Sequence, residues 1–296
     1  MKRRFVTLDV FTDRRFVGNP LAVVLEAEGL DTATMQTIAR EFNHPETVFV
    51  LPAADAAHRA KLRIFTPAAE LPFAGHPTVG TAVLIGRLDG GTPRDFVLEE
   101  GIGPVHCAVE QVTAEGGRAR FDLPRLPAPA EGAPCAVDAA AALGLEPGDI
   151  GFDGFAPASW SAGMGFPMIP VAGLAAIARC RPDPARFEQV FGVGGPGKAY
   201  AFCRETAEPG RDFHARMFAP GMGIPEDPAT GAAAAAFAGM IAGRLGDGAH
   251  RVRIEQGYEM GRPSLIELAL TIRDGRLAAA AIGGGAVVAT EGTIEA

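Results

Sequence analysis

Two long segments that are apolar on every face stand out from a chain of short strand-like runs. Runs such as "RFVTLDVF" and "SLIELALTI" have the length and alternation of β-strands. Residues 77–88 and 228–245 have no polar stripe, so a helix formed by either cannot lie on a surface. We expect two central helices, each with proline at its first position and strands on all sides.

Four motifs occur twice, in the same order, about half a chain apart. The pairs are "GNPLAVV" and "GFPMIPV", "RIFTP" and "RMFAP", "HPTVGTA" and "DPATGAA", and "LEEG" and "IEQG". In this alignment His76-Pro77 corresponds to Asp227-Pro228. Four colinear matches are hard to obtain by chance, so the sequence predicts two homologous halves.

The repeat and the buried helices together predict an α+β fold. We expect two pseudosymmetric lobes, each a strongly curved, barrel-like β-sheet wrapped around a central buried helix. The first lobe covers residues 1–124 and the second residues 125–283, with the active site in the cleft between them. One surface helix is expected at Thr32–Phe42, with Asp31 or Thr32 as its cap.

The amino-terminal ends of the central helices are candidate anion sites. A helix N-terminus exposes unpaired N–H groups and carries roughly +0.5 charge, which suits a carboxylate or phosphate. Gly75 and Gly231 let a ligand approach the backbone closely. The simpler interpretation is that His76 and Asp227 only cap these helices, since Asp is favoured there. Their correspondence across the repeat favours a shared site instead.

A third candidate group is Glu46, which follows Pro45 and begins an apolar strand. Shielding from water, here by Val48 and Phe49, raises the pKa of a carboxyl group and suits it to general acid–base catalysis. The alternative is a solvated glutamate at a strand end. The matching stretch of the second half, "GKAYAFC", has no carboxylate, so the two halves contribute unequally.

Composition excludes several other classes of protein. The net charge of -8 and the pI near 5.3 argue against a nucleic-acid partner. The longest apolar run, 232–242, is too short to span a membrane, and the apolar run at the N-terminus stops at Asp9, too early for a signal peptide. We therefore expect a cytoplasmic protein. Neither a disulfide framework nor a metal site is indicated by the four scattered cysteines, Cys107, Cys135, Cys180 and Cys203.

Several longer segments resemble the phenazine-biosynthesis-like (PhzF-like) isomerase family. They are "DVFTDRRFVGNPLAVV", "IAREFNHPETVFV", "RIFTPAAELPFAGHPTVGTA", "RMFAPGMGIPEDPATGAAAA" and "EQGYEMGRPS", and they cover nearly the whole chain. The family is similar in fold to diaminopimelate epimerase, which implies two lobes around central helices. The resemblance also implies that residues 284–296 return as a strand to the first lobe and that the protein is a homodimer.

The resemblance implies a double-bond shift in a small carboxylate-bearing molecule, without cofactor or metal. Glu46 matches the family's proton-transfer glutamate, and His76 and Asp227 match residues that line the substrate pocket. These three are the predicted catalytic residues. The predicted substrate-binding residues are Asn19, Gly75, Gly231 and Ala232.

Two positions depart from the phenazine isomerase pattern. That enzyme has a serine directly after the Thr-Gly of the second motif, where this chain has Ala232. Losing one hydrogen bond to a charged group costs roughly 1.5–3 kcal/mol, enough to change the substrate. The other departure is Pro45, where the isomerase has a small polar residue before the glutamate.

The sequence therefore predicts a cofactor-independent isomerase that transfers a proton, by a double-bond or tautomer shift. One alternative is an epimerase or racemase, which needs acid–base groups on both faces of one carbon; Asp227 is the candidate for the second group. Another is a non-catalytic homologue that binds a small molecule, which only Ala232 favours. Family membership fixes the chemistry better than the substrate.

Overall fold

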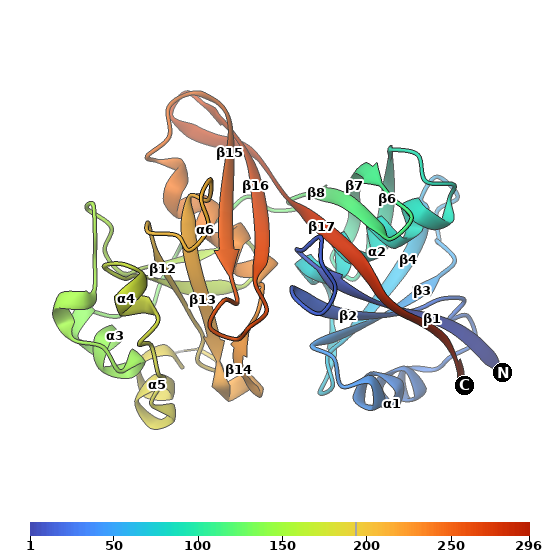
Figure 1. Ribbon diagram of the computed structural model, residues 1–296, viewed down its shortest axis with the longest axis horizontal. Coiled ribbons are helices and arrows are strands. Elements are labelled where there is room, and N and C mark those ends of the chain that lie inside the picture. The colour runs from blue at the N-terminus through green and yellow to red at the C-terminus, as the bar shows by residue number, and fades with distance from the viewer. Residues whose placement is uncertain (193) are drawn as a thin grey trace. The chain divides into compact units, whose positions relative to one another are not determined.

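The computed structural model describes residues 1–192 and 194–296, which form two compact units (Figure 1). The first unit comprises Met1–Pro124 and Ile282–Ala296, and the second comprises Arg125–Ala281. The last strand, β17 (Arg276–Glu295), runs through the boundary and contributes to both units. Each unit is a curved sheet with one buried helix, so the predicted α+β class is confirmed.

The sheet of the first unit closes on itself. Its pairings run β1–β2, β2–β3, β3–β4, β4–β6, β6–β7, β7–β8, β8–β17 and β17–β1, of which β2–β3 and β4–β6 are parallel. The strands are β1 (Lys2–Val10), β2 (Asn19–Val24), β3 (Glu46–Leu51), β4 (Ala60–Phe65), β5 (Glu70–Leu71), β6 (Arg94–Glu100), β7 (Gly103–Val112) and β8 (Gly116–Asp122).

The second unit repeats this order of pairings from β10 to β17. The parallel steps recur at β11–β12 and β13–β15, and the short hairpin β4–β5 recurs as β13–β14. Two homologous halves are thus present in the structure as well as in the sequence. The strands are β9 (Ala128–Ala130), β10 (Ala158–Ser161), β11 (Gly165–Pro170), β12 (Ala199–Cys203), β13 (Phe213–Ala219), β14 (Ile224–Asp227), β15 (Gly248–Gln256) and β16 (Ser264–Arg273).

Smaller helices cover the outside of each sheet. In the first unit α1 (Thr32–Phe42) packs Met35 and Ala39 against β3 and β4, and Asp31 caps it by accepting from the Thr34 N–H at 2.7 Å, as predicted. In the second unit three helices gather on one side of the sheet (Figure 1). They are α3 (Ala136–Leu143), α4 (Leu174–Ile177) and α5 (Pro184–Phe191); single 3₁₀ turns lie at Pro147–Asp149 and Pro220–Met222.

The two central helices are buried on every face, as their apolar sequences predict. All residues of α2 (Gly75–Leu88) from Gly75 to Gly86 are buried, and so are ten of the twelve residues of α6 (Gly231–Ala242). Because these helices are buried on every face, most of their stability comes from packing against the surrounding sheet. None of the helices in the described residues is long and apolar enough to cross a membrane.

The predicted starts of both helices were wrong. Pro77 is the third residue of α2, and Pro228 lies three residues before α6. The residue before a proline favours extended backbone, and Asp227 accordingly ends strand β14, where it pairs with Met217. The N-cap residues are Ala74 and Thr230. The interpretation of His76 and Asp227 as helix caps therefore does not hold.

The structure also corrects the alignment of the two halves. Ile64 pairs with Leu71 in β4–β5, and Met217 pairs with Asp227 in β13–β14. Because "RIF" and "RMF" correspond, Asp227 corresponds to Leu71. The same offset relates Gly75 to Gly231, the first residues of the two helices. The repeat partner of His76 is therefore Ala232, and Asp227 belongs to a different position of the repeat.

An arginine–glutamate pair holds the same hairpin in both units. Arg63 binds Glu70 through two hydrogen bonds of 2.7 and 2.6 Å, and Arg216 binds Glu226 through two of 2.8 Å. Each guanidinium also lies over the phenylalanine two residues later, at 5.1 and 4.8 Å from the ring centroid. This explains why an Arg-x-Phe sequence recurs in each half.

Gly239 lets α6 approach the sheet closely. A Cβ atom there would lie 2.4 Å from Cε3 of Trp160 and 3.0 Å from Cβ of Pro127. We expect Gly239→Ala to destabilise the protein by about 1–3 kcal/mol through overpacking, even though alanine favours helix by about 1 kcal/mol. The control is Gly243→Ala at the end of α6, where no atom lies within 4 Å. Equal urea midpoints for the two variants would contradict the packing argument.

Candidate active site

In the first unit, Glu46 and His76 meet directly. Glu46 is the first residue of β3, and His76 is the second residue of α2. Nε2 of His76 lies 3.3 Å from Oε2 of Glu46, and the two side chains are 6% and 14% exposed. Val48 and Phe49, which follow Glu46 in the strand, are fully buried. The carboxyl group therefore sits in shielded surroundings.

The imidazole ring of His76 is neutral. Burial lowers the pKa of His76 to about 3, although a hydrogen bond to the backbone of Pro20 works in the opposite direction. Since Nε2 faces Glu46, the nitrogen that donates to Pro20 is Nδ1. The tautomer is thus fixed, and Nε2 presents a lone pair to the carboxyl oxygen. A lone pair there accepts an O–H hydrogen bond from a protonated carboxyl, so the pair is suited to holding and releasing a proton.

The start of β2 lies beside both Glu46 and His76. Leu21 pairs with Glu46 in the parallel ladder, and the preceding residue, Pro20, binds His76. Asn19 comes just before and is fully buried, opposite Val10 of β1. Gly75 opens α2 beside His76. The structure thus places four sequence-predicted residues, Asn19, Glu46, Gly75 and His76, around one strand end.

In the second unit, Asp227 is held by two residues that the sequence analysis did not assign to the site. The Thr230 hydroxyl donates to Oδ2 of Asp227 at 2.5 Å. Nε2 of Gln256 donates to the Asp227 carbonyl at 2.8 Å and to Oγ1 of Thr230 at 3.0 Å. All three residues are buried. The orientation of the carboxylate is therefore fixed by a hydrogen-bonded chain from Gln256 through Thr230.

Gly231 and Ala232 are the first two residues of α6, directly after Thr230. Their backbone N–H groups belong to the first turn, which has no intrahelical acceptors for them. The Thr230 side chain makes no capping hydrogen bond: its hydroxyl donates to Asp227, and its oxygen accepts from Gln256. The helix end is thus left available to an anion.

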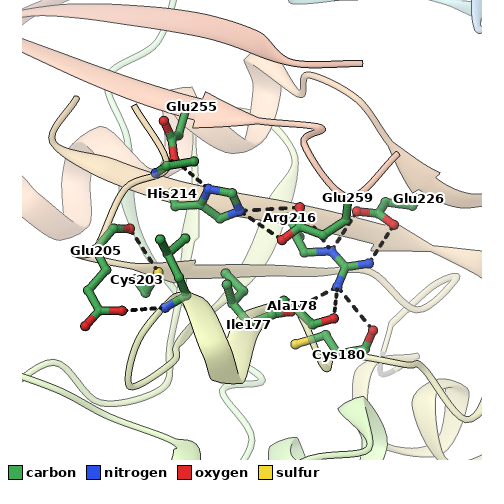
Figure 2. Close-up of polar contacts among 12 residues, drawn as sticks. Ile177, Ala178, Cys180, Cys203, Glu205, His214, Arg216, Glu226, Glu255 and Glu259 are labelled. Atoms are coloured by element: carbon green, nitrogen blue, oxygen red, sulfur yellow. Dashed lines mark hydrogen bonds and ion pairs between the residues drawn. The ribbon is translucent and has the colours of Figure 1, made fainter. Parts of the chain in front are cut away.

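The second unit also contains a charged network that includes His214, Glu255 and Glu259 (Figure 2). His214 contacts Glu255 at 2.7 Å through Nδ1 and Glu259 at 3.1 Å through Nε2. Burial disfavours the imidazolium, but these two hydrogen bonds outweigh burial and raise the pKa of His214 to about 9. The loop that carries Glu259 packs on Pro228, since a Cβ on Gly257 would lie 2.6 Å from the Pro228 carbonyl oxygen.

Thr230 and Gln256 both lie in motifs that the sequence analysis singled out, but neither was assigned to the site. "IEQG" served only to align the halves, and the threonine of "ATG" was taken as part of the helix. In the residues that the structure describes, no group of three or more His, Cys, Asp or Glu side chains is arranged to hold a metal ion.

Comparison with known proteins identifies the family. Residues 8–292 match the family described as phenazine biosynthesis-like protein. The chain is 50% identical to an uncharacterized isomerase of Mesorhizobium japonicum, over 99% of this chain and 98% of the relative. It is 32% identical to the trans-2,3-dihydro-3-hydroxyanthranilate isomerase of Pseudomonas chlororaphis, over 98% of each.

A solved structure agrees with this assignment. The PhzF-family phenazine biosynthesis protein of Bacillus anthracis is similar with a TM-score of 0.89 and 26% identity, over 100% of both chains. The fold, the family match and the named relatives all point the same way. The chain therefore belongs to the phenazine biosynthesis-like (PhzF) family and is an isomerase.

Proposed function

We propose that this isomerase moves a proton within a small carboxylate-bearing substrate, by a double-bond or tautomer shift, without a cofactor. The observation that carries the proposal is the shielded contact between Glu46 and the neutral ring of His76. A carboxyl group beside a fixed hydrogen-bond acceptor can hold and release a proton, as general acid–base catalysis requires. The resemblance to the dihydro-hydroxyanthranilate isomerase supports the same chemistry.

The proposed step balances without an oxidant or a reductant. Glu46 as carboxylate takes a proton from one carbon of the substrate, and the electron pair of that C–H bond shifts into a new double bond. The old double bond moves its electrons to the far carbon, which takes the proton back from the Glu46 carboxyl. His76 accepts a hydrogen bond from the protonated carboxyl and so stabilises the intermediate stage.

The helix ends are the proposed sites for anionic groups of the substrate, each within its own unit. In the first unit the proposed donor is the N–H group of Gly75, with Asn19 as a further polar contact, and in the second unit the proposed donors are the N–H groups of Gly231 and Ala232. Asp227 is proposed to orient the substrate, since its own carboxylate is fixed by Thr230. Because Ala232 lacks a hydroxyl, a substrate other than that of the phenazine isomerase is favoured. A homodimer, which rests on the family resemblance, and a cytoplasmic location, which rests on the sequence analysis, belong to this proposal.

The test is a panel of small unsaturated or hydroxylated carboxylic acids incubated with the protein and no added cofactor. The proposal expects one acid to give a product of unchanged mass with a different NMR spectrum. A product that differs only in the configuration of one carbon would instead favour the epimerase alternative. Saturable binding of an acid with no conversion would favour the non-catalytic alternative.

A further inference from the structure

A buried glutamate that the proposed reaction does not use contacts the first turn of α2. Glu100, the last residue of β6, is 7% exposed, and its Oε1 lies 2.7 Å from Oγ1 of Thr78. Oε2 is also buried, with no hydrogen-bond partner among the described residues. The same Thr78 oxygen lies 2.8 Å from the carbonyl oxygen of Ala74, the N-cap of α2.

These two contacts fix where the protons are. A threonine hydroxyl has one proton to donate and can accept with its lone pairs. The Ala74 carbonyl can only accept, so Thr78 must donate to it. The remaining short contact, between Oγ1 and Glu100, is then satisfied only if the Glu100 carboxyl carries a proton and donates it to Thr78.

The second unit uses the neutral equivalent at the matching position. "LEEG" ends in Glu100-Gly101, and "IEQG" ends in Gln256-Gly257, at the offset that also relates Gly75 to Gly231. There Nε2 of Gln256 donates to Oγ1 of Thr230 at 3.0 Å, beside the start of α6. A glutamine amide has the shape of a protonated glutamate and donates at any pH. A side chain of this shape therefore contacts the start of the central helix in both halves, although Thr230 matches Ala74 rather than Thr78 in the repeat.

We propose that Glu100 is a positioning residue that is held as a protonated carboxylic acid and fixes the first turn of α2, which carries Gly75 and His76, through Thr78. Deprotonation would place a carboxylate against a hydroxyl whose proton is already used by Ala74. The first turn would then lose the hydrogen bond that joins Thr78 to Glu100 of β6. This inference rests on the fold and the hydrogen bonds, and it stands apart from the proposed reaction.

The surroundings of Glu100 favour the acid form. Burial raises the pKa of Glu100 to about 8, although the hydrogen bond with Thr78 works in the opposite direction. From β7 comes the Cys107 thiol, whose pKa is raised chiefly by burial and further by the neighbouring carboxyl groups of Glu100 and of Asp122 in β8. From α2 comes Thr78, and β4 pairs Ala60 and Lys61 with Leu98 and Glu99. Glu100 has no ion-pair partner among the residues described.

The experiment compares the wild type with Glu100→Gln and with Glu99→Gln as the matched control. Glu99 is the neighbouring carboxylate; backbone N–H groups of Ala54 and Asp55 lower its pKa to about 2. Between about pH 4.5 and about pH 8, the folded wild type keeps a proton on Glu100 that the unfolded chain releases. Its unfolding equilibrium constant should therefore rise up to tenfold per pH unit relative to Glu100→Gln, and level off above pH 8.

Urea unfolding from pH 5 to pH 9 measures the ratio of the unfolding equilibrium constants of the wild type and Glu100→Gln. The backbone amide NMR signals of Gly75 and Thr78 report the conformation of the first turn of α2. We expect these signals to titrate near pH 8 in the wild type and in Glu99→Gln, and to stay constant in Glu100→Gln. A wild-type to Glu100→Gln ratio that does not change with pH would overturn the inference. So would a Glu100→Gln protein that fails to fold, because glutamine is the isostere of the neutral acid.

Discussion

Replacing Arg216 with methionine is expected to destabilise the second unit by about 3–5 kcal/mol. The Arg216 and Glu226 side chains are only 4% and 15% exposed, and their pair is bidentate. The guanidinium also donates to the carbonyls of Ile177 and Cys180, as Figure 2 shows. Methionine would leave Glu226 buried without its cation and these carbonyls without a donor. Trp160, the sole tryptophan, lies in this unit and can report its unfolding by fluorescence.

The first unit offers a matched control in Arg63→Met. Arg63 makes the same bidentate pair with Glu70 in the corresponding hairpin, but the side chains are 22% and 39% exposed. Because water can solvate the glutamate that remains, we expect a loss of only about 0–1 kcal/mol, measured by circular dichroism in urea. If both variants lost the same free energy, burial would not be the reason that the pair in the second unit matters.

Replacing Glu46 with glutamine is expected to lower turnover by about 10²–10⁴-fold, the usual contribution of a general acid–base group. Glutamine keeps the size of the side chain and brings an amide donor to the side of His76, whose Nε2 lies 3.3 Å from Oε2 of Glu46. It cannot take up or release a proton. We therefore expect the affinity for the acid and the thermal stability of the protein to change little. The measurement is steady-state turnover and equilibrium binding of one acid identified by the panel.

Asp227→Asn is the companion variant for this experiment. Asparagine can still accept from the Thr230 hydroxyl, which lies 2.5 Å from the carboxylate in the wild type. If Asp227 only orients the substrate, this variant should be less impaired than Glu46→Gln. A Glu46→Gln enzyme that worked at the wild-type rate would remove Glu46 from the reaction. The non-catalytic alternative would become the leading one if no acid were converted by the wild type either.

The sequence predicted the fold best where a whole segment was apolar or where a motif was repeated. The two central helices follow from segments that are apolar on every face, and the two halves follow from four repeated motifs. The exact alignment of the two halves could not be predicted. "TVGTA" and "ATGAA" align on Gly80 and Gly231, whereas the structure relates Gly75 to Gly231. Three residues, Gly221, Met222 and Gly223, extend the β13–β14 hairpin and shift everything after it. Strand pairing is a long-range property, so only the structure reveals that shift.

The site was predictable by residue type but not by contact. Glu46, His76 and Asp227 could be named from the sequence, since each stands next to a proline in a repeated or distinctive motif. The partners that set their state could not. No local pattern shows that Pro20 binds His76, or that Gln256 binds the Thr230 hydroxyl and the Asp227 carbonyl. These contacts join residues from separate strands or turns.

The most direct test of proton transfer by Glu46 is the exchange of a carbon-bound hydrogen of the substrate with D₂O. Exchange responds to a double-bond shift and to epimerisation alike, and it does not depend on where the equilibrium lies. A carboxyl proton exchanges with solvent between turnovers, so deuterium should accumulate in the acid when the wild type is present. The account predicts that Glu46→Gln lowers the exchange rate by about 10²–10⁴-fold. Exchange by Glu46→Gln at the wild-type rate would contradict it.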